Sequence, residues 1–298
     1  MAHHVVPPGV EYHRVLAGGK RRIGRGVLAI VLLLAGIVLL PTAIGRGAAL
    51  IDLQWGNTTP ILGGTDYTPL HHAAGMFSLG LLIPWSMLIQ RVLYGVRGPS
   101  LHSVVSRFRF DVFGRALVHL GPVWVIVIVL GFLAPAEESP WSQVDLVLMF
   151  LGTLLLTPLQ AAGEEYGFRG LVLRVAGSWA RGPRAGLVVG VVVSTLAFTL
   201  IHGSTDPYIT AWYLVLAAGL ALMTWRTGGI EIAVVLHALL NTVTLIAAPL
   251  LRIDLAAGLS DRSAGVGSPY QLVPTATLAA ITAVVWWWTR RTGPALTT

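Results

Sequence analysis

Apolar residues fill long stretches of this 298-residue chain, and polar residues interrupt them at regular intervals. A transmembrane helix needs about 20 mostly apolar residues to cross about 30 Å of hydrocarbon. Eight stretches fit that length: Val27–Ile44, Ala73–Leu93, Ala116–Leu133, Leu146–Ala162 (continuing helically through Val175), Gly186–Ile201, Ile209–Trp225, Ile230–Ala248 and Leu272–Trp288. The pattern therefore predicts an all-α fold, a polytopic transmembrane helix bundle of about eight spans.

Composition supports a membrane protein. Hydrophobic residues make up 55% of the chain and charged residues only 11%, whereas a soluble domain carries roughly 25% charged residues. The chain has no cysteine, which excludes disulfides and thiolate metal sites. Its net charge of +7 is typical of basic cytoplasmic loops, so we expect membrane lipids as partners and no nucleic acid.

The positions of Lys and Arg predict the orientation. With eight spans and both termini in the cytoplasm, 17 of the 20 basic residues face the cytoplasm and three face the other side, as the positive-inside rule requires. Nineteen of the 20 are Arg, a bias that favours a GC-rich bacterial genome and hence the bacterial plasma membrane. The first apolar run lacks a clear small-residue cleavage pattern, which favours a retained helix over a signal peptide.

The chain divides into four predicted regions. Residues 1–26 form a cytoplasmic tail, and residues 27–143 hold the first helices with a basic interfacial loop. Residues 144–250 form the core that carries the polar motifs, and residues 251–298 add a loop, the last helix and a cytoplasmic tail. Within the second region, Arg97–Phe113 mixes Arg with Phe, which is typical of an interfacial helix on anionic headgroups; an ordinary basic loop is the alternative.

Charged residues in or beside a span are costly and tend to be functional. The sequence GEEYGFRG places Glu165 and Arg169 four residues apart with the acid first, which favours an ion pair on a helix. Glu164 points about 100° away from that pair, so its carboxylate is left for other work. The alternative is that the helix ends at the headgroups, where such charges are ordinary.

Two further apolar stretches carry polar residues at helical spacing. His202 follows Phe198 by one turn, and Asn241 follows His237 by one turn. Interfacial exposure would explain His202, and helix–helix hydrogen bonds would explain His237 and Asn241. The hairpin between the fourth and fifth spans and the short turn before the seventh nevertheless predict that all these residues meet Glu164 at a similar depth.

The ordered motifs EExxxR, FxxxH and HxxxN, over roughly residues 145–250, resemble the CAAX-protease and bacteriocin-processing (CPBP) family of intramembrane proteases. The Ras-converting CAAX prenyl endopeptidases are members of that family. The resemblance implies an intramembrane endopeptidase acting on a peptide or protein substrate, prenylated or not. It also implies that Glu165 and Arg169 brace the site.

The remaining roles are also implied by the resemblance. Glu164 would activate a water, His202 would help to hold that water, and His237 and Asn241 would stabilise the oxyanion. The family is often labelled metalloprotease, so the cofactor is either none or a zinc held by Glu164, His202 and His237. Two His and one carboxylate form a known catalytic zinc set, but HExxH is absent, which favours catalysis without metal.

Two other functions compete with proteolysis. A catalytically silent member of the family would serve as a membrane scaffold or bacteriocin-immunity protein, but the complete set of polar residues argues against this. A small transporter would use the same buried charges as an ion relay, but inverted repeats that would favour it are not found in the sequence.

Overall fold

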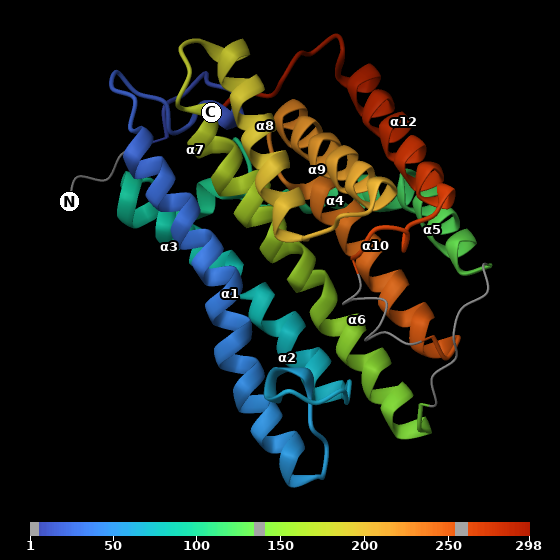
Figure 1. Ribbon diagram of the computed structural model, residues 1–298. Coiled ribbons are helices and arrows are strands. Elements are labelled where there is room, and N and C mark those ends of the chain that lie inside the picture. Colours follow the sequence, from blue (N-terminus) through green and yellow to red (C-terminus); the bar gives the residue numbers. More distant parts are fainter. Residues whose placement is uncertain (1–5, 134–140, 254–261) are drawn as a thin grey trace.

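The computed structural model describes residues 6–133, 141–253 and 262–298, and no β-strand occurs among them. The first part of the predicted N-terminal tail (1–5) and part of the loop after residue 250 (254–261) lie outside the described residues. Figure 1 shows the helices packed as one bundle. They are α1 (Ile23–Gln54), α2 (Pro69–Gly80), α3 (Leu82–Tyr94), α4 (Phe110–His119), α5 (Gly121–Leu130), α6 (Gln143–Glu165), α7 (Leu173–Gly177), α8 (Pro183–Ile201), α9 (Pro207–Thr227), α10 (Glu231–Leu250) and α12 (Leu272–Thr289).

The predicted polytopic bundle is confirmed. In the described part of the chain, seven helices are long and apolar enough to cross a membrane, and the bent pair α4–α5 would make an eighth. One of the seven is Gln143–Gly177, because α6 and α7 are joined by a π-helical turn, Tyr166–Val172. Large apolar side chains such as Val38, Leu39 and Leu155 are exposed on the bundle, as a lipid-facing surface requires.

Prolines distort two of the predicted spans. The helix expected at Ala73–Leu93 is broken at Leu81 between α2 and α3, three residues before Pro84. The span expected at Ala116–Leu133 is bent: α4 and α5 meet at an angle of 51°, with Pro122 at the start of α5. A proline ring clashes with the carbonyl four residues earlier and removes one helical N–H donor, so each break falls just before the proline.

The basic segment before α4 is a folded loop, so the interfacial helix expected at Arg97–Phe113 is not formed. A short 3₁₀ turn, Gly98–Leu101, is followed by irregular chain that runs to the start of α4 at Phe110. Ser106 adopts a left-handed conformation at φ 56°, which is unfavourable in a continuous right-handed helix. The alternative of a basic loop therefore holds for this segment.

One arginine of this loop is tied to the start of α10. The guanidinium of Arg109 donates to both carboxylate oxygens of Glu231, at 2.8 and 2.7 Å, and its backbone N–H donates to the same carboxylate at 3.0 Å. Glu231 is fully buried. Such a bidentate pair fixes both distance and orientation, so the loop and α10 are held together.

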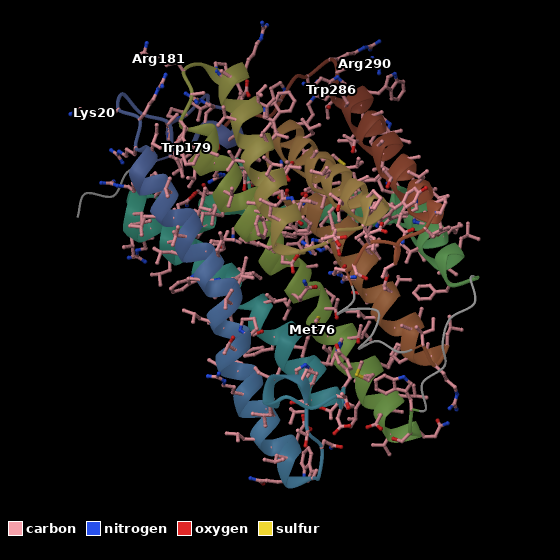
Figure 2. All side chains as sticks on the ribbon, viewed as in Figure 1. Lys20, Met76, Trp179, Arg181, Trp286 and Arg290 are labelled. Carbon is pink, nitrogen blue, oxygen red and sulfur yellow. The ribbon has the colours of Figure 1, made fainter. Side chains whose placement is uncertain are left out.

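Residues 6–18, the N-terminal arm, lie across one end of the bundle. Tyr12 donates to the carbonyl of Leu101, Arg14 donates to the carbonyls of Gly177 and Ala180, and Trp225 donates to Glu11. Glu11 also pairs with Leu296 near the C-terminus. Both described ends of the chain therefore lie at the same end of the bundle (Figure 1), where Lys20, Arg181 and Arg290 also project (Figure 2).

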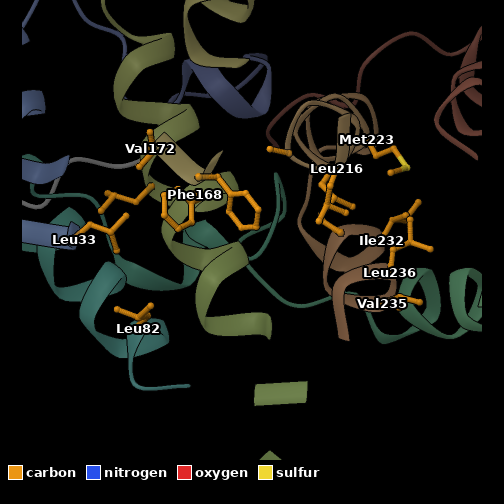
Figure 3. Packing of buried hydrophobic residues seen from close by; sticks show 14 of the residues in the cluster. Leu33, Leu82, Phe168, Val172, Leu216, Met223, Ile232, Val235 and Leu236 are labelled. Carbon is orange, nitrogen blue, oxygen red and sulfur yellow. The ribbon is translucent and has the colours of Figure 1, made fainter. Parts of the chain in front are cut away.

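The apolar core surrounds the π-helical turn and the α9–α10 pair. Phe168 lies among Leu33, Leu82 and Val172, and Leu216 faces α10 (Figure 3). Helix α6 packs closely on α2 at Gly163, where a Cβ atom would lie 2.0 Å from the carbonyl oxygen of Leu79. Only glycine fits this approach, which brings the next residue, Glu164, into the middle of the bundle.

Candidate active site

The two glutamates lie deep in the protein, at the junction of α6 and the π-helical turn. Glu165 and Arg169 are fully buried, and Glu164 is 8% exposed. The π-helical turn begins at Tyr166 and contains Arg169. Turns of this kind are rare and are frequent at functional sites. The alternative that these charges lie at the headgroup end of a helix is wrong, because the helix continues to Gly177.

Glu165 forms the expected ion pair and a second contact. Its Oε1 atom lies 3.1 Å from Nη1 of Arg169 and 2.7 Å from Nδ1 of His237. The same carboxylate oxygen therefore joins α6, the π-helical turn and α10. A buried charge is tolerated when it is paired, and here two partners share it.

Glu164 has a different set of neighbours. Its Oε1 atom accepts a hydrogen bond of 2.6 Å from the side-chain amide of Gln160. Its Oε2 atom lies 3.6 Å from Nε2 of His237 and has no hydrogen-bond partner among the described residues. A carboxylate with one oxygen held and the other unoccupied is suited to accept a proton at the second oxygen.

Asn241 is connected to this carboxylate by hydrogen bonds that pass through Gln160. Its Nδ2 atom donates to Oε1 of Gln160 at 2.9 Å, and Gln160 in turn donates to Glu164. Gln160 was missed in the sequence, although it precedes Glu164 by one helical turn. That spacing was a usable signal, because residues four apart share a helix face.

His202 approaches from the end of α8. Its Nδ1 atom lies 2.7 Å from the carbonyl oxygen of Phe198. Since a carbonyl only accepts, Nδ1 carries the proton, and Nε2 of the neutral imidazole is an acceptor. The ring packs against two aromatic rings, with its centroid 4.5 Å from that of Phe198 and 4.1 Å from that of Tyr213. The sequence did not predict Tyr213 as a site residue, because no recognisable motif surrounds it.

Phe198 connects the histidine with the buried cation. The guanidinium of Arg169 lies over the Phe198 ring at 4.2 Å from its centroid. Cation–π contacts of this kind reach about 2 kcal/mol or more when they are desolvated. Arg169 is therefore held by the Glu165 carboxylate and by an aromatic face, which fixes the pair in the apolar interior.

A cavity of about 510 Å³ opens on these side chains. The structure places Glu164, His202, His237 and Asn241 in its lining. Glu165 and Arg169 lie behind them and are not part of the lining. The rest of the wall is mostly apolar, including Ile128, Phe132, Trp212, Leu240 and Leu245. Cavities of about 300–1,000 Å³ with a few convergent polar groups are typical of small-ligand and substrate sites.

The loop at residues 262–265 is anchored to the segment that follows His202, and its Arg262 lines the cavity. The carboxylate of Asp206 accepts from the backbone N–H of Gly265 and from the first N–H groups of α9. Burial alone would raise the pKa of Asp206, but these N–H groups outweigh it and lower the pKa. The carbonyl of Arg262, which lines the cavity, accepts from Thr205.

The three alternative zinc ligands, Glu164, His202 and His237, all line the cavity. Among the residues that the structure describes, no group of three or more His, Asp or Glu side chains could hold a metal ion. His237 uses Nδ1 on Glu165 and His202 uses Nδ1 on a carbonyl, which leaves each imidazole only its Nε2 atom. Zinc binding by Glu164, His202 and His237 therefore stays a prediction.

The fold and the site define a polytopic helical membrane protein with buried carboxylates, imidazoles and an amide around one cavity. Residues 143–243 match the family model described as type II CAAX prenyl endopeptidase Rce1-like. This part of the chain is similar to the CAAX protease family; it begins with the first residue of α6 and contains every predicted site residue. Comparisons with curated proteins and with solved structures gave no match.

Proposed function

We propose that this protein is an intramembrane endopeptidase in which Glu164 activates a water molecule for attack on a peptide carbonyl. The family match supports CAAX-type endopeptidase activity in general. The observation that carries the mechanism is the unpartnered Oε2 atom of Glu164, which faces Nε2 of His237 at the wall of the cavity.

The proposed first step is proton transfer from water. Nε2 of His202 accepts a hydrogen bond from one O–H of the water and so orients it. Nδ1 of the same ring is not available for this, because it donates to the carbonyl of Phe198. Glu164 takes the other hydrogen at Oε2 as the water oxygen bonds to the carbonyl carbon. A positioned general base of this kind contributes about 10²–10⁴ in rate.

The carbonyl oxygen becomes an oxyanion in this step. The free N–H of the Asn241 amide donates to it, and so does Nε2 of His237 when that imidazole carries two protons. A fixed donor at this position is worth about 10²–10³ in rate. Glu164 then returns its proton to the leaving nitrogen as the carbon–nitrogen bond breaks, so that proton count and charge balance.

The cavity wall favours an apolar substrate segment. Trp212, Phe132 and Leu245 contribute large apolar surfaces next to the polar groups. A peptide near a C-terminal prenyl group fits this lining, as does an apolar peptide without one. An internally quenched farnesylated peptide and its unmodified counterpart, assayed side by side, distinguish the two.

The decisive test compares membranes from cells expressing the wild type with those expressing Glu164→Gln. We expect new protein termini with the wild type that are missing with the variant, and these termini name the substrate. Equal sets of termini from both would contradict the proposed function and favour the silent scaffold.

Metal dependence is tested on the same preparations. Without metal catalysis, chelated protein keeps its activity and metal analysis finds well under one zinc per chain. If zinc is held, chelation silences the enzyme and zinc restores it. Stoichiometric zinc that is bound by the wild type and lost in His202→Ala would establish the zinc alternative.

A further inference from the structure

Gln160 lies between two of the proposed catalytic groups. It sits on α6 one turn before Glu164, it is 4% exposed, and it lines the cavity. Its amide contacts both groups directly: the nitrogen donates to Glu164 at 2.6 Å, and the oxygen accepts from Asn241 at 2.9 Å.

The chemistry of the three groups fixes the orientation of both amides. An ionised carboxylate can only accept hydrogen bonds, so Gln160 must turn its NH₂ group toward Glu164. Its carbonyl then faces Asn241, which must donate a hydrogen bond from its own NH₂ group. The carboxylate of Glu164 thus sets the direction of an amide on another helix, and it does so through Gln160.

This arrangement decides which atoms remain for catalysis. Oε1 of Glu164 is held by Gln160, so Oε2 is the oxygen left to take a proton. One N–H of Asn241 is held by Gln160, so the second is left for the oxyanion. Without Gln160 the Asn241 amide could rotate by half a turn and present its carbonyl oxygen, which repels an oxyanion.

We propose that Gln160 is a positioning residue that couples the general base Glu164 to the oxyanion donor Asn241. This inference rests on the proposed function, because it assigns Gln160 a task in that reaction. The coupling requires the volume of the side chain, a donor at one end and an acceptor at the other. Gln160→Met keeps the volume and removes both.

Thr157 supplies a matched control. It lies on α6 one turn before Gln160, it is fully buried, and its hydroxyl has no hydrogen-bond partner among the described residues. Thr157→Val therefore changes the same helix in the same environment without touching the proposed network. Both variants are compared with the wild type in detergent, with the farnesylated and unmodified quenched peptides.

For Gln160→Met we expect kcat to fall by about 10- to 100-fold, because an oxyanion donor loses its alignment. KM should stay within about twofold, because ground-state contacts with the peptide are unchanged. Thr157→Val should keep both constants. A rise of KM with kcat unchanged, or equal losses in the two variants, would show that Gln160 serves only packing or binding.

A double-mutant cycle with Asn241 tests the coupling itself. Residues that act through one another give non-additive effects, so Gln160→Met should cost much less in an Asn241→Ala background than in the wild type. The full loss in both backgrounds would overturn the proposal. If the wild type cleaves, Glu164→Gln does not, and Gln160→Met cleaves normally, this inference fails while the proposed function stands. Equal cleavage by wild type and Glu164→Gln rejects both.

Discussion

Glu165 joins α6 to α10 through a contact of 2.7 Å between its Oε1 atom and Nδ1 of His237. The same oxygen pairs with Arg169, so Glu165 does more than neutralise one cation. A carboxylate at one ring nitrogen fixes the orientation of an imidazole and determines which nitrogen faces the site. Here it directs Nε2 of His237 toward Glu164.

The two adjacent glutamates should therefore respond differently to the same substitution. Glu164→Gln removes the base but no charged partner that depends on it, so cleavage should be lost and folding nearly intact. Glu165→Gln leaves Arg169 as a buried charge without compensation, which costs about 3–5 kcal/mol, and activity should fall as well. Melting curves in detergent, recorded beside the cleavage assay, measure both effects.

Removing the cation as well should restore part of the stability. In Glu165→Gln with Arg169→Met neither charge is left alone, so the double variant should melt above Glu165→Gln. Activity should stay low, because the amide orients His237 less firmly than the carboxylate. Equal destabilisation by Glu164→Gln and Glu165→Gln, with no recovery in the double variant, would show that the roles are reversed.

The pair Arg109–Glu231 should control the stability of α10. Arg109→Met leaves Glu231 buried and unpaired, and we expect a loss of about 3–5 kcal/mol in the free energy of unfolding. The control is Arg107→Met, two residues away and exposed, for which we expect less than about 0.5 kcal/mol. Thermal unfolding that is the same for the two variants would mean that the buried pair adds nothing.

Acid should loosen the N-terminal arm. Burial lowers the pKa of His13, although the carbonyl of Pro183 and the carboxylate of Glu11 act in the opposite direction and Arg14 adds to the lowering. A lowered pKa in the folded state means that the neutral imidazole is preferred there. The stabilisation is therefore complete above the unfolded pKa of about 6.5 and is lost as pH falls through the folded value.

Hydrogen exchange of the arm at pH 7.5 and pH 5 measures this effect. After correction for intrinsic rates, protection of residues 9–16 should drop at the lower pH in the wild type. His13→Gln keeps a donor for the Pro183 carbonyl and cannot titrate, so its protection should depend less on pH. An identical pH dependence in the two proteins would exclude His13 as the cause.

Topology is testable because the chain lacks cysteine. Arg181 and Thr65 are exposed and belong to loops that the eight-span arrangement places on opposite sides of the membrane. With both termini in the cytoplasm, Arg181→Cys should react with an impermeant thiol reagent only from inside, and Thr65→Cys only from outside. Labelling of both positions from one side would contradict the predicted orientation.

The sequence by itself determined the helical bundle and the positions of the polar motifs. Both are local properties: the length of an apolar run fixes whether it can span a membrane, and a spacing of four places two residues on one helix face. The pairing of Glu165 with Arg169 follows from such a spacing and is present in the structure. The bend at Pro122 shows how a single residue can interrupt a helix within an apolar stretch that is long enough to be one span.

Only the tertiary structure decided the contacts between distant residues. Gln160 and Asn241 are 81 positions apart, Glu165 and His237 are 72 apart, and Arg109 and Glu231 are 122 apart. No periodicity links such pairs, because their distance depends on how whole helices pack. The approach of α6 to α2 at Gly163 and the tie between Arg109 and Glu231 set that packing, and with it the geometry of the cavity in which Glu164 lies.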